Sequence, residues 1–111
     1  MKNVHKVVVY KTVDSNGNPE FRVEPGRLIA SVGDTLIFKV NRSVDVVVTV
    51  QFPPYLYDRR LRQVIALQPG HSESRQVSAD AEEKAYPYLV FCPHPGPKAV
   101  GASEPEIIID N

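Results

Sequence analysis

Hydrophobic and polar residues alternate along this chain in short runs. Segments of about five to nine residues rich in valine, isoleucine, threonine and tyrosine are separated by clusters of glycine, proline, asparagine and aspartate. The chain contains 10 prolines, each of which removes a backbone donor and disfavours helix at the preceding residue. The pattern therefore predicts an all-β domain, a sandwich or a barrel, rather than a helical fold.

We expect seven or eight strands. The first is predicted at 4–12, the most β-prone run lies at 44–52, and the final strand is predicted at 106–110. The Asn-Gly pair within 14–19 is the strongest turn signal in the sequence. A short helix is expected only near 55–62, where Pro53 and Pro54 precede a suitable spacing of apolar residues.

Length and charge narrow the possible functions. At 111 residues, the chain is expected to form one domain over 1–111. Thirteen basic and 13 acidic residues balance, so no overall field favours nucleic acid as a partner. The sequence contains no apolar stretch long enough for a transmembrane helix and no signal-peptide pattern. We therefore expect either an intracellular protein or a chain that begins after a removed leader.

Two longer stretches carry a family resemblance: PEFRVEPGRLIASVGDTLIFKVN at 19–41 and LQPGHSESRQVSADAEEKAYPYLVFCPHPG at 67–96. A strand pair leads into Gly-Asp-Thr, and a later Pro-Gly turn precedes a tyrosine-rich strand that ends in cysteine. In order and spacing these features resemble the cupredoxins, the plastocyanin-type blue copper domains. The resemblance implies a Greek-key β-sandwich of two sheets with its ligand loops at one end, and it suggests an extracytoplasmic location.

The same resemblance implies a copper site. Cupredoxins hold copper with two histidines, one cysteine and usually a weak methionine, a set that suits both oxidation states of the metal. Cys92 and His94 match the cysteine and the loop histidine, with only one residue between them. The other histidine is expected within 44–46, where the chain has Val-Asp-Val, and Ala99 or Val100 stands in place of the methionine. We therefore expect no ordinary type 1 copper centre.

The predicted topology offers a substitute ligand set. The strands around 73–78 and 86–92 should run in opposite directions, which places His71 at the same end of the domain as Cys92 and His94. Together with Asp45 these residues would give a mixed Cys-His-His-Asp metal site. The alternatives are a solvated turn histidine, a loop-capping carboxylate and a buried, inert thiol. His5 is not expected to belong to this site.

The remaining signals point to binding rather than catalysis. Pro93 and Pro95 would stiffen the cysteine loop, and a second loop brings together the aromatic and basic side chains of Tyr55, Tyr57, Arg59 and Arg60. No phosphate-binding glycine loop or nucleophile motif is present, so an enzyme is not expected. The leading hypothesis is a binding or accessory module with a protein partner and no cofactor. The alternatives are a copper-binding electron carrier with an irregular site and a redox sensor that acts through Cys92.

Overall fold

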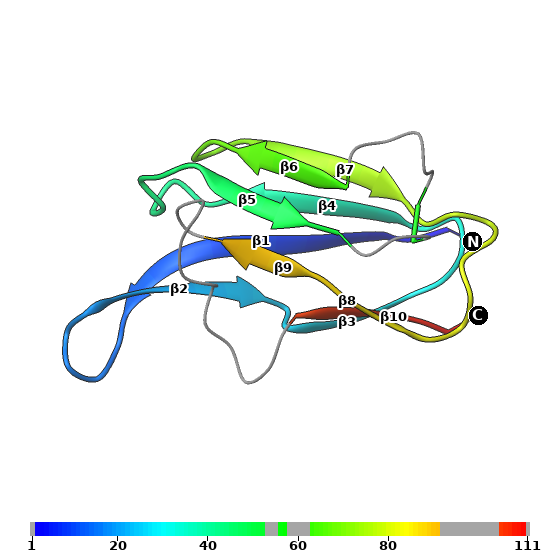
Figure 1. Ribbon diagram of the computed structural model, residues 1–111, viewed down its shortest axis with the longest axis horizontal. Helices are drawn as coiled ribbons and strands as arrows, with labels where there is room; N and C mark the ends of the chain where they lie inside the picture. Colours follow the sequence, from blue (N-terminus) through cyan, green and yellow to red (C-terminus); the bar gives the residue numbers. More distant parts are fainter. Residues whose placement is uncertain (1, 53–55, 58–62, 92–104, 111) are drawn as a thin grey trace.

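The computed structural model describes residues 2–52, 56–57, 63–91 and 105–110. Within these residues the protein is all-β and contains no helix (Figure 1). In this described part of the chain the ten strands are β1 (Val4–Val13), β2 (Pro19–Glu24), β3 (Arg27–Ala30), β4 (Thr35–Val40), β5 (Val48–Gln51), β6 (Val64–Leu67), β7 (Ser72–Gln76), β8 (Ala85–Pro87), β9 (Leu89–Phe91) and β10 (Glu106–Ile109).

The first layer is a four-stranded sheet in the order β2-β1-β4-β7. Strands β1 and β4 are parallel, whereas β2 and β7 run antiparallel to their neighbours. Alternate residues of β1 and β4 are buried, among them Val7, Val9, Leu36 and Phe38. The alternation in the sequence is thus the alternation of a sheet with one face on the core.

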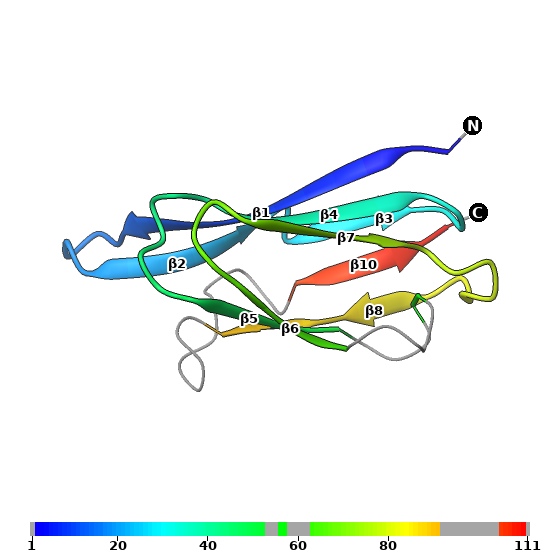
Figure 2. The same cartoon turned by 90° about the horizontal axis from the view of Figure 1, so that it is seen from above.

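The other strands form two three-stranded sheets, β6-β5-β9 and β3-β10-β8, and the latter runs from β3, level with the first layer, through β10 to β8 in the second layer (Figure 2). Strands β8 and β9 follow one another along a single segment that is interrupted at Tyr88, whose N–H donates to the carbonyl of Pro105 at 3.0 Å. Figure 2 shows β5, β6 and β8 stacked beneath β1, β4 and β7. The protein is therefore a two-layer sandwich in which the strand order requires the chain to cross between layers.

The core between the layers contains a cluster of aromatic rings. The ring of Phe38 lies edge-on to Phe52 with 4.8 Å between centroids, and edge-on to Tyr88 at 5.7 Å. Such edge-to-face pairs add about 0.5–1.5 kcal/mol each beyond the burial of apolar area. The cluster joins β4 of one layer to the segment between β8 and β9 of the other.

The expected fold class is confirmed, and the described residues differ from the prediction in two details. The described residues alone form ten strands where seven or eight were expected, in part because Tyr88 divides the strand predicted at 86–92. The strand predicted at 44–52 is shorter, since the chain turns at Asn41 and becomes extended only at Val48. The predicted helix at 55–62 lies outside the described residues except for 56–57, which form a bend.

Candidate functional site

One end of the sandwich gathers a loop, a turn and a strand end. The loop 41–47 connects β4 to β5, and the turn 68–71 connects β6 to β7. Backbone hydrogen bonds join the turn to the last residue of β4, directly before the loop: Val40 N–H donates to His71 O at 3.0 Å, and Gly70 N–H donates to Val40 O at 2.8 Å. Phe91, the last residue of β9, pairs with Thr49 at the start of β5. We call this region the loop end, and it lies at the left of Figure 1.

The conformation of the loop 41–47 follows from Asn41. Its side-chain oxygen accepts a hydrogen bond from Ser43 N–H at 2.8 Å, and its carbonyl accepts one from Val44 N–H at 3.0 Å. These bonds form the self-capped turn that asparagine favours. The Ser43 hydroxyl in turn accepts a hydrogen bond from the backbone N–H of Lys11 at 3.1 Å. The turn is thereby fastened to β1.

The turn directs residues 44–46 away from a common site. Val44 is 0% exposed and belongs to the hydrophobic core, and Val46 packs against that core. The Asp45 side chain is 69% exposed and lies 3.5 Å from the ammonium nitrogen of Lys11. Exposed ion pairs of this kind contribute about 0–1 kcal/mol. The positions at which a first histidine was expected therefore hold two apolar side chains and one solvated carboxylate.

His71 occupies the last position of a tight turn. Its N–H donates to the carbonyl of Gln68 at 3.0 Å, and Gly70 has φ +82°. Proline followed by a glycine with positive φ is typical of a type II turn. The His71 residue is exposed. The structure thus brings the turn of His71 beside the loop of Asp45, while the Asp45 carboxylate itself pairs with Lys11.

Several predicted site residues lie outside the described part of the chain: Cys92, Pro93, His94, Pro95, Tyr55, Arg59 and Arg60. Among the residues that the structure does describe, no group of three or more histidine, cysteine, aspartate or glutamate side chains could hold a metal ion. The Cys-His-His-Asp set therefore remains a prediction.

Tyr57 lies in the core instead of on the surface. It is 5% exposed, and its ring packs edge-on against Phe52 with 5.2 Å between centroids. Burial raises the pKa of its hydroxyl. This placement leaves the ring little surface for a partner.

Arg75, which no sequence motif indicated, is a charged side chain buried beside the rings of Tyr57 and Phe52. Its side chain is 7% exposed, and the guanidinium carbon lies 5.3 Å from the centroid of Tyr57 and 5.8 Å from that of Phe52. Its Nη1 donates to Glu73 Oε1 and to Ser74 O, both at 2.9 Å. Its buried Nε has no hydrogen-bond partner among the described atoms. The alternating pattern of β7 offered a signal, because Arg75 stands at an inward-facing position.

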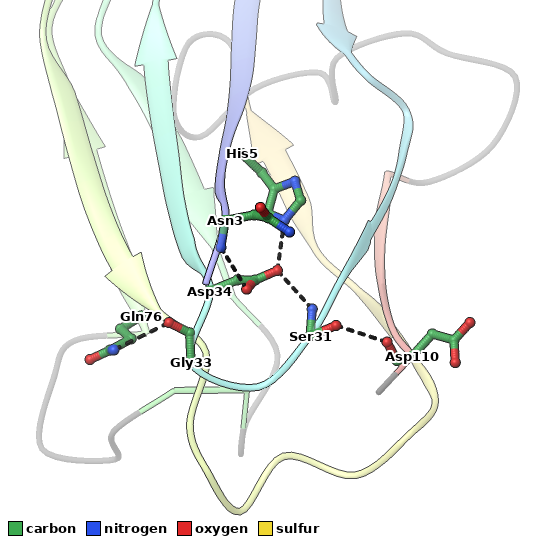
Figure 3. Close-up of polar contacts among 7 residues, drawn as sticks. All are labelled: Asn3, His5, Ser31, Gly33, Asp34, Gln76 and Asp110. Carbon is green, nitrogen blue, oxygen red and sulfur yellow. Dashed lines mark hydrogen bonds and ion pairs between the residues drawn. The ribbon is translucent and has the colours of Figure 1, made fainter. Parts of the chain in front are cut away.

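A second polar cluster lies at the opposite end of the sandwich and centres on Asp34 (Figure 3). Asp34 is 2% exposed. Its Oδ1 accepts a hydrogen bond from Asn3 N–H at 3.0 Å, and its Oδ2 accepts one from Ser31 N–H at 3.0 Å. The Oδ2 atom also lies 2.8 Å from His5 Nε2. The hydrogen bonds from Asn3, His5 and Ser31, in that order, lower the pKa of Asp34 to about 2.

The position of His5 agrees with the expectation that it has no part in the loop end. Because β1 and β4 are parallel, His5 pairs with Leu36 at one end of the sheet, and Val9 pairs with Val40 at the other. The sequence motif Gly-Asp-Thr, which includes Asp34, did not reveal that Asp34 holds the first strand in place. The contact spans 29 residues, so no local pattern indicates it.

Comparisons with solved structures identify this architecture. A purple cupredoxin from Nitrosopumilus maritimus is similar with a TM-score of 0.60 and 16% identity, over 96% of this chain and 99% of that one. The protein has the cupredoxin fold. A copper nitrite reductase from Nitrosomonas europaea gives a TM-score of 0.62 and 16% identity, over 98% of this cupredoxin-like domain and 42% of the reductase chain. No model of a known protein family matches the sequence, and no curated protein does.

The fold confirms the resemblance to cupredoxins that the motifs indicated. The cupredoxin-like domain spans less than half of the reductase chain. Within its described residues, no helix has both the length and the apolar character needed to cross a membrane.

Proposed function

We propose that this cupredoxin-like domain is a non-catalytic binding or accessory module that forms no ordinary type 1 copper centre. The observation that supports this most directly is Val44, which is 0% exposed where the resemblance leads us to expect an imidazole nearby. Its working surface is the loop end, built from the loop 41–47 and the turn 68–71. The partner is a protein, and the fold favours an extracytoplasmic location.

The donor chemistry of the loop 41–47 supports this proposal. A type 1 site requires two imidazoles and a thiolate in a trigonal array. Fully burying a valine side chain stabilises a protein by about 1.5–3 kcal/mol, so Val44 stays in the core. The only charged donor at 44–46 is the carboxylate of Asp45, a hard ligand that suits magnesium, calcium or manganese better than Cu(I). The described part of the loop therefore does not fit the metal of the fold family.

A copper titration tests the proposal. We expect that Cu(II) added to the purified, reduced protein produces no intense visible thiolate-to-copper band, and that Cys92→Ser gives the same spectrum as the wild type. An intense band that is lost in Cys92→Ser would refute the proposal, because it would demonstrate a thiolate-bound copper in the visible spectrum.

The second candidate is a copper-binding electron carrier with an irregular site made by Cys92, His94, His71 and Asp45. The observation that favours it is the pair of backbone hydrogen bonds between Val40 and residues 70 and 71, which holds the turn of His71 beside the loop of Asp45. This candidate predicts that His71→Ala and Asp45→Asn each weaken the visible band. His5→Ala is the control, since His5 lies at the opposite end of β1 and should leave the spectrum unchanged.

A further inference from the structure

The turn between β1 and β2 contains the one asparagine of the sequence that precedes a glycine, Asn16 before Gly17. Such a pair is open to a spontaneous covalent change, because glycine has no side chain to keep its nitrogen away from the asparagine amide. The nitrogen loses its proton and attacks the asparagine Cγ, ammonia leaves, and a cyclic succinimide remains. Water then opens the ring to aspartate, or to isoaspartate, in which the main chain runs through the side-chain carbon.

The neighbouring sequence makes this reaction harder at the other internal asparagines. Asn18 precedes Pro19, whose nitrogen carries no proton to lose. Asn3 precedes a valine and Asn41 precedes an arginine, and these larger side chains crowd the attacking nitrogen. Asn16 is therefore the position at which deamidation is chemically most favourable.

The folded turn holds the attacking nitrogen in a hydrogen bond. Gly17 N–H donates to the carbonyl of Asp14 at 3.0 Å, and Asp14 N–H donates to the carbonyl of Asn18 at 2.9 Å. Gly17 has φ +82°, and a turn followed by a glycine with positive φ is a usual form of short hairpin loop. The proton that the reaction must remove is thus shared with a backbone carbonyl as long as the turn stays closed.

The Asp14 side chain fastens the same turn. Its Oδ1 accepts hydrogen bonds from the backbone N–H groups of Asn16 at 2.8 Å and Asn18 at 2.9 Å. The bonds from Asn18 and Asn16, in that order, lower the pKa of Asp14, so the acceptor is a carboxylate at neutral pH. Hydrogen bonds to an ionised acceptor are stronger than those between neutral groups. Asp14 therefore contributes three of the contacts that close the turn, two through Oδ1 and one through its carbonyl.

Solvent has free access to this turn. Asn16 and Gly17 are both exposed, so the base that removes the proton and the water that opens the ring are present at the site. Burial gives the asparagine no protection. The hydrogen bonds of the turn are what oppose the reaction in the folded protein.

We propose that Asn16 is the site at which this chain deamidates, and that Asp14 sets the rate by holding the turn closed. The reaction then requires a local opening that releases Gly17 N–H, and such openings occur without global unfolding. Isoaspartate adds a carbon to the main chain of the turn, so its formation would disturb the pairing of β1 with β2.

Incubation of the full chain in mildly alkaline buffer, either folded or unfolded in guanidinium chloride, tests the proposal. Trypsin cleaves after Lys11 and Arg22 and releases a peptide that contains Asn16 and Asn18. Fragmentation of this peptide in a mass spectrometer locates the amide that has become an acid. We expect conversion at Asn16, at least about tenfold slower in the folded protein than in the unfolded chain.

Substitutions at Asp14 test its part in the rate. Asp14→Ala should accelerate conversion in the folded protein at least about threefold, because it removes both hydrogen bonds to Oδ1. Asp14→Asn is the matched control: its amide oxygen can accept the same bonds, so it should accelerate conversion less. The differences should vanish in guanidinium chloride, where no turn is present and charges are screened.

Circular dichroism of each variant verifies that the fold is retained. The expected order of rates in the folded state, together with equal rates in the unfolded state, supports the proposal. Conversion that is equally fast in the folded and unfolded wild type overturns it without the need for any variant. Earlier conversion at Asn3 or Asn41 overturns the assignment of the site, and a folded Asp14→Ala that converts at the rate of the wild type or of Asp14→Asn overturns the role of Asp14.

Discussion

Asp34 offers the sharpest test of the energetics of this fold, through the substitution Asp34→Asn. The buried carboxylate accepts hydrogen bonds from Asn3 and Ser31 and contacts His5, and its pKa falls from 3.8 to about 2. One pKa unit corresponds to about 1.4 kcal/mol, so the ionised form stabilises the folded state by on the order of 2 kcal/mol at neutral pH. The asparagine amide also turns a donor toward one of the backbone N–H groups. We therefore expect Asp34→Asn to lower the free energy of unfolding by at least about 2 kcal/mol.

The pH dependence of this effect follows from the direction of the shift. The pKa is lower in the folded state than in the unfolded state, so the ionised carboxylate contributes its full stabilisation above about pH 4. That contribution is lost as the pH falls through about 2. Urea unfolding of the wild type and Asp34→Asn at several pH values measures the difference, which should shrink between about pH 4 and about pH 2.

Asp45→Asn serves as the control for this series. Its carboxylate is 69% exposed and lies 3.5 Å from the ammonium nitrogen of Lys11. We expect a loss of less than about 1 kcal/mol. A cost for Asp34→Asn as small as that of Asp45→Asn, or a difference that stays constant from about pH 4 to about pH 2, would refute the reasoning about Asp34.

Two further predictions concern stability and are measured by the same urea titrations. Arg75→Met should change the free energy of unfolding by less than about 1 kcal/mol, because methionine fills the site and removes the buried Nε, which has no hydrogen-bond partner among the described atoms. Arg75→Ala should instead cost about 2–4 kcal/mol through the cavity that it leaves. Equal costs for the two variants would contradict this. Gly70→Ala should cost about 1–2 kcal/mol, since φ is +82° and the new Cβ would lie 3.3 Å from the Arg42 side chain. Gly26→Ala is the control and should leave the free energy of unfolding nearly unchanged, because a Cβ at Gly26 meets nothing within 4 Å. If Gly70→Ala also left the free energy of unfolding unchanged, the positive φ of Gly70 in the turn 68–71 would be wrong.

The layers of this fold could be predicted because they follow from alternation. Val7 and Val9, or Leu36 and Phe38, are apolar at every second position, and each pair is buried. The shortening of the strand predicted at 44–52 could not be foreseen, since Val44 to Val48 have the composition of a strand. What ends the strand pattern there is a set of hydrogen bonds around Asn41 that depends on Lys11, which is remote in sequence.

The loop end was predictable as a place but not in its detailed contacts. Reversal of direction between successive strands was enough to place His71 at the same end of the domain as Phe91, the last described residue of its strand. Whether side chains converge there depends on rotamers and partners, and Asp45 illustrates this by lying beside Lys11 of β1. The buried positions of Arg75 and Asp34 also arise from tertiary packing, because charged residues usually lie at the surface.

The Asp34 cluster also determines how the domain can be attached to something else. Asn3 is held by Asp34, and the carbonyl of Asp110 accepts a hydrogen bond from the Ser31 hydroxyl at 2.9 Å, so both ends of the described chain lie together (Figure 3). A tether, a reporter protein or a sensor chip joined to either one would therefore orient the molecule in the same way. The loop end, at the opposite end of the sandwich, would face away from the attachment point in both cases and stay accessible.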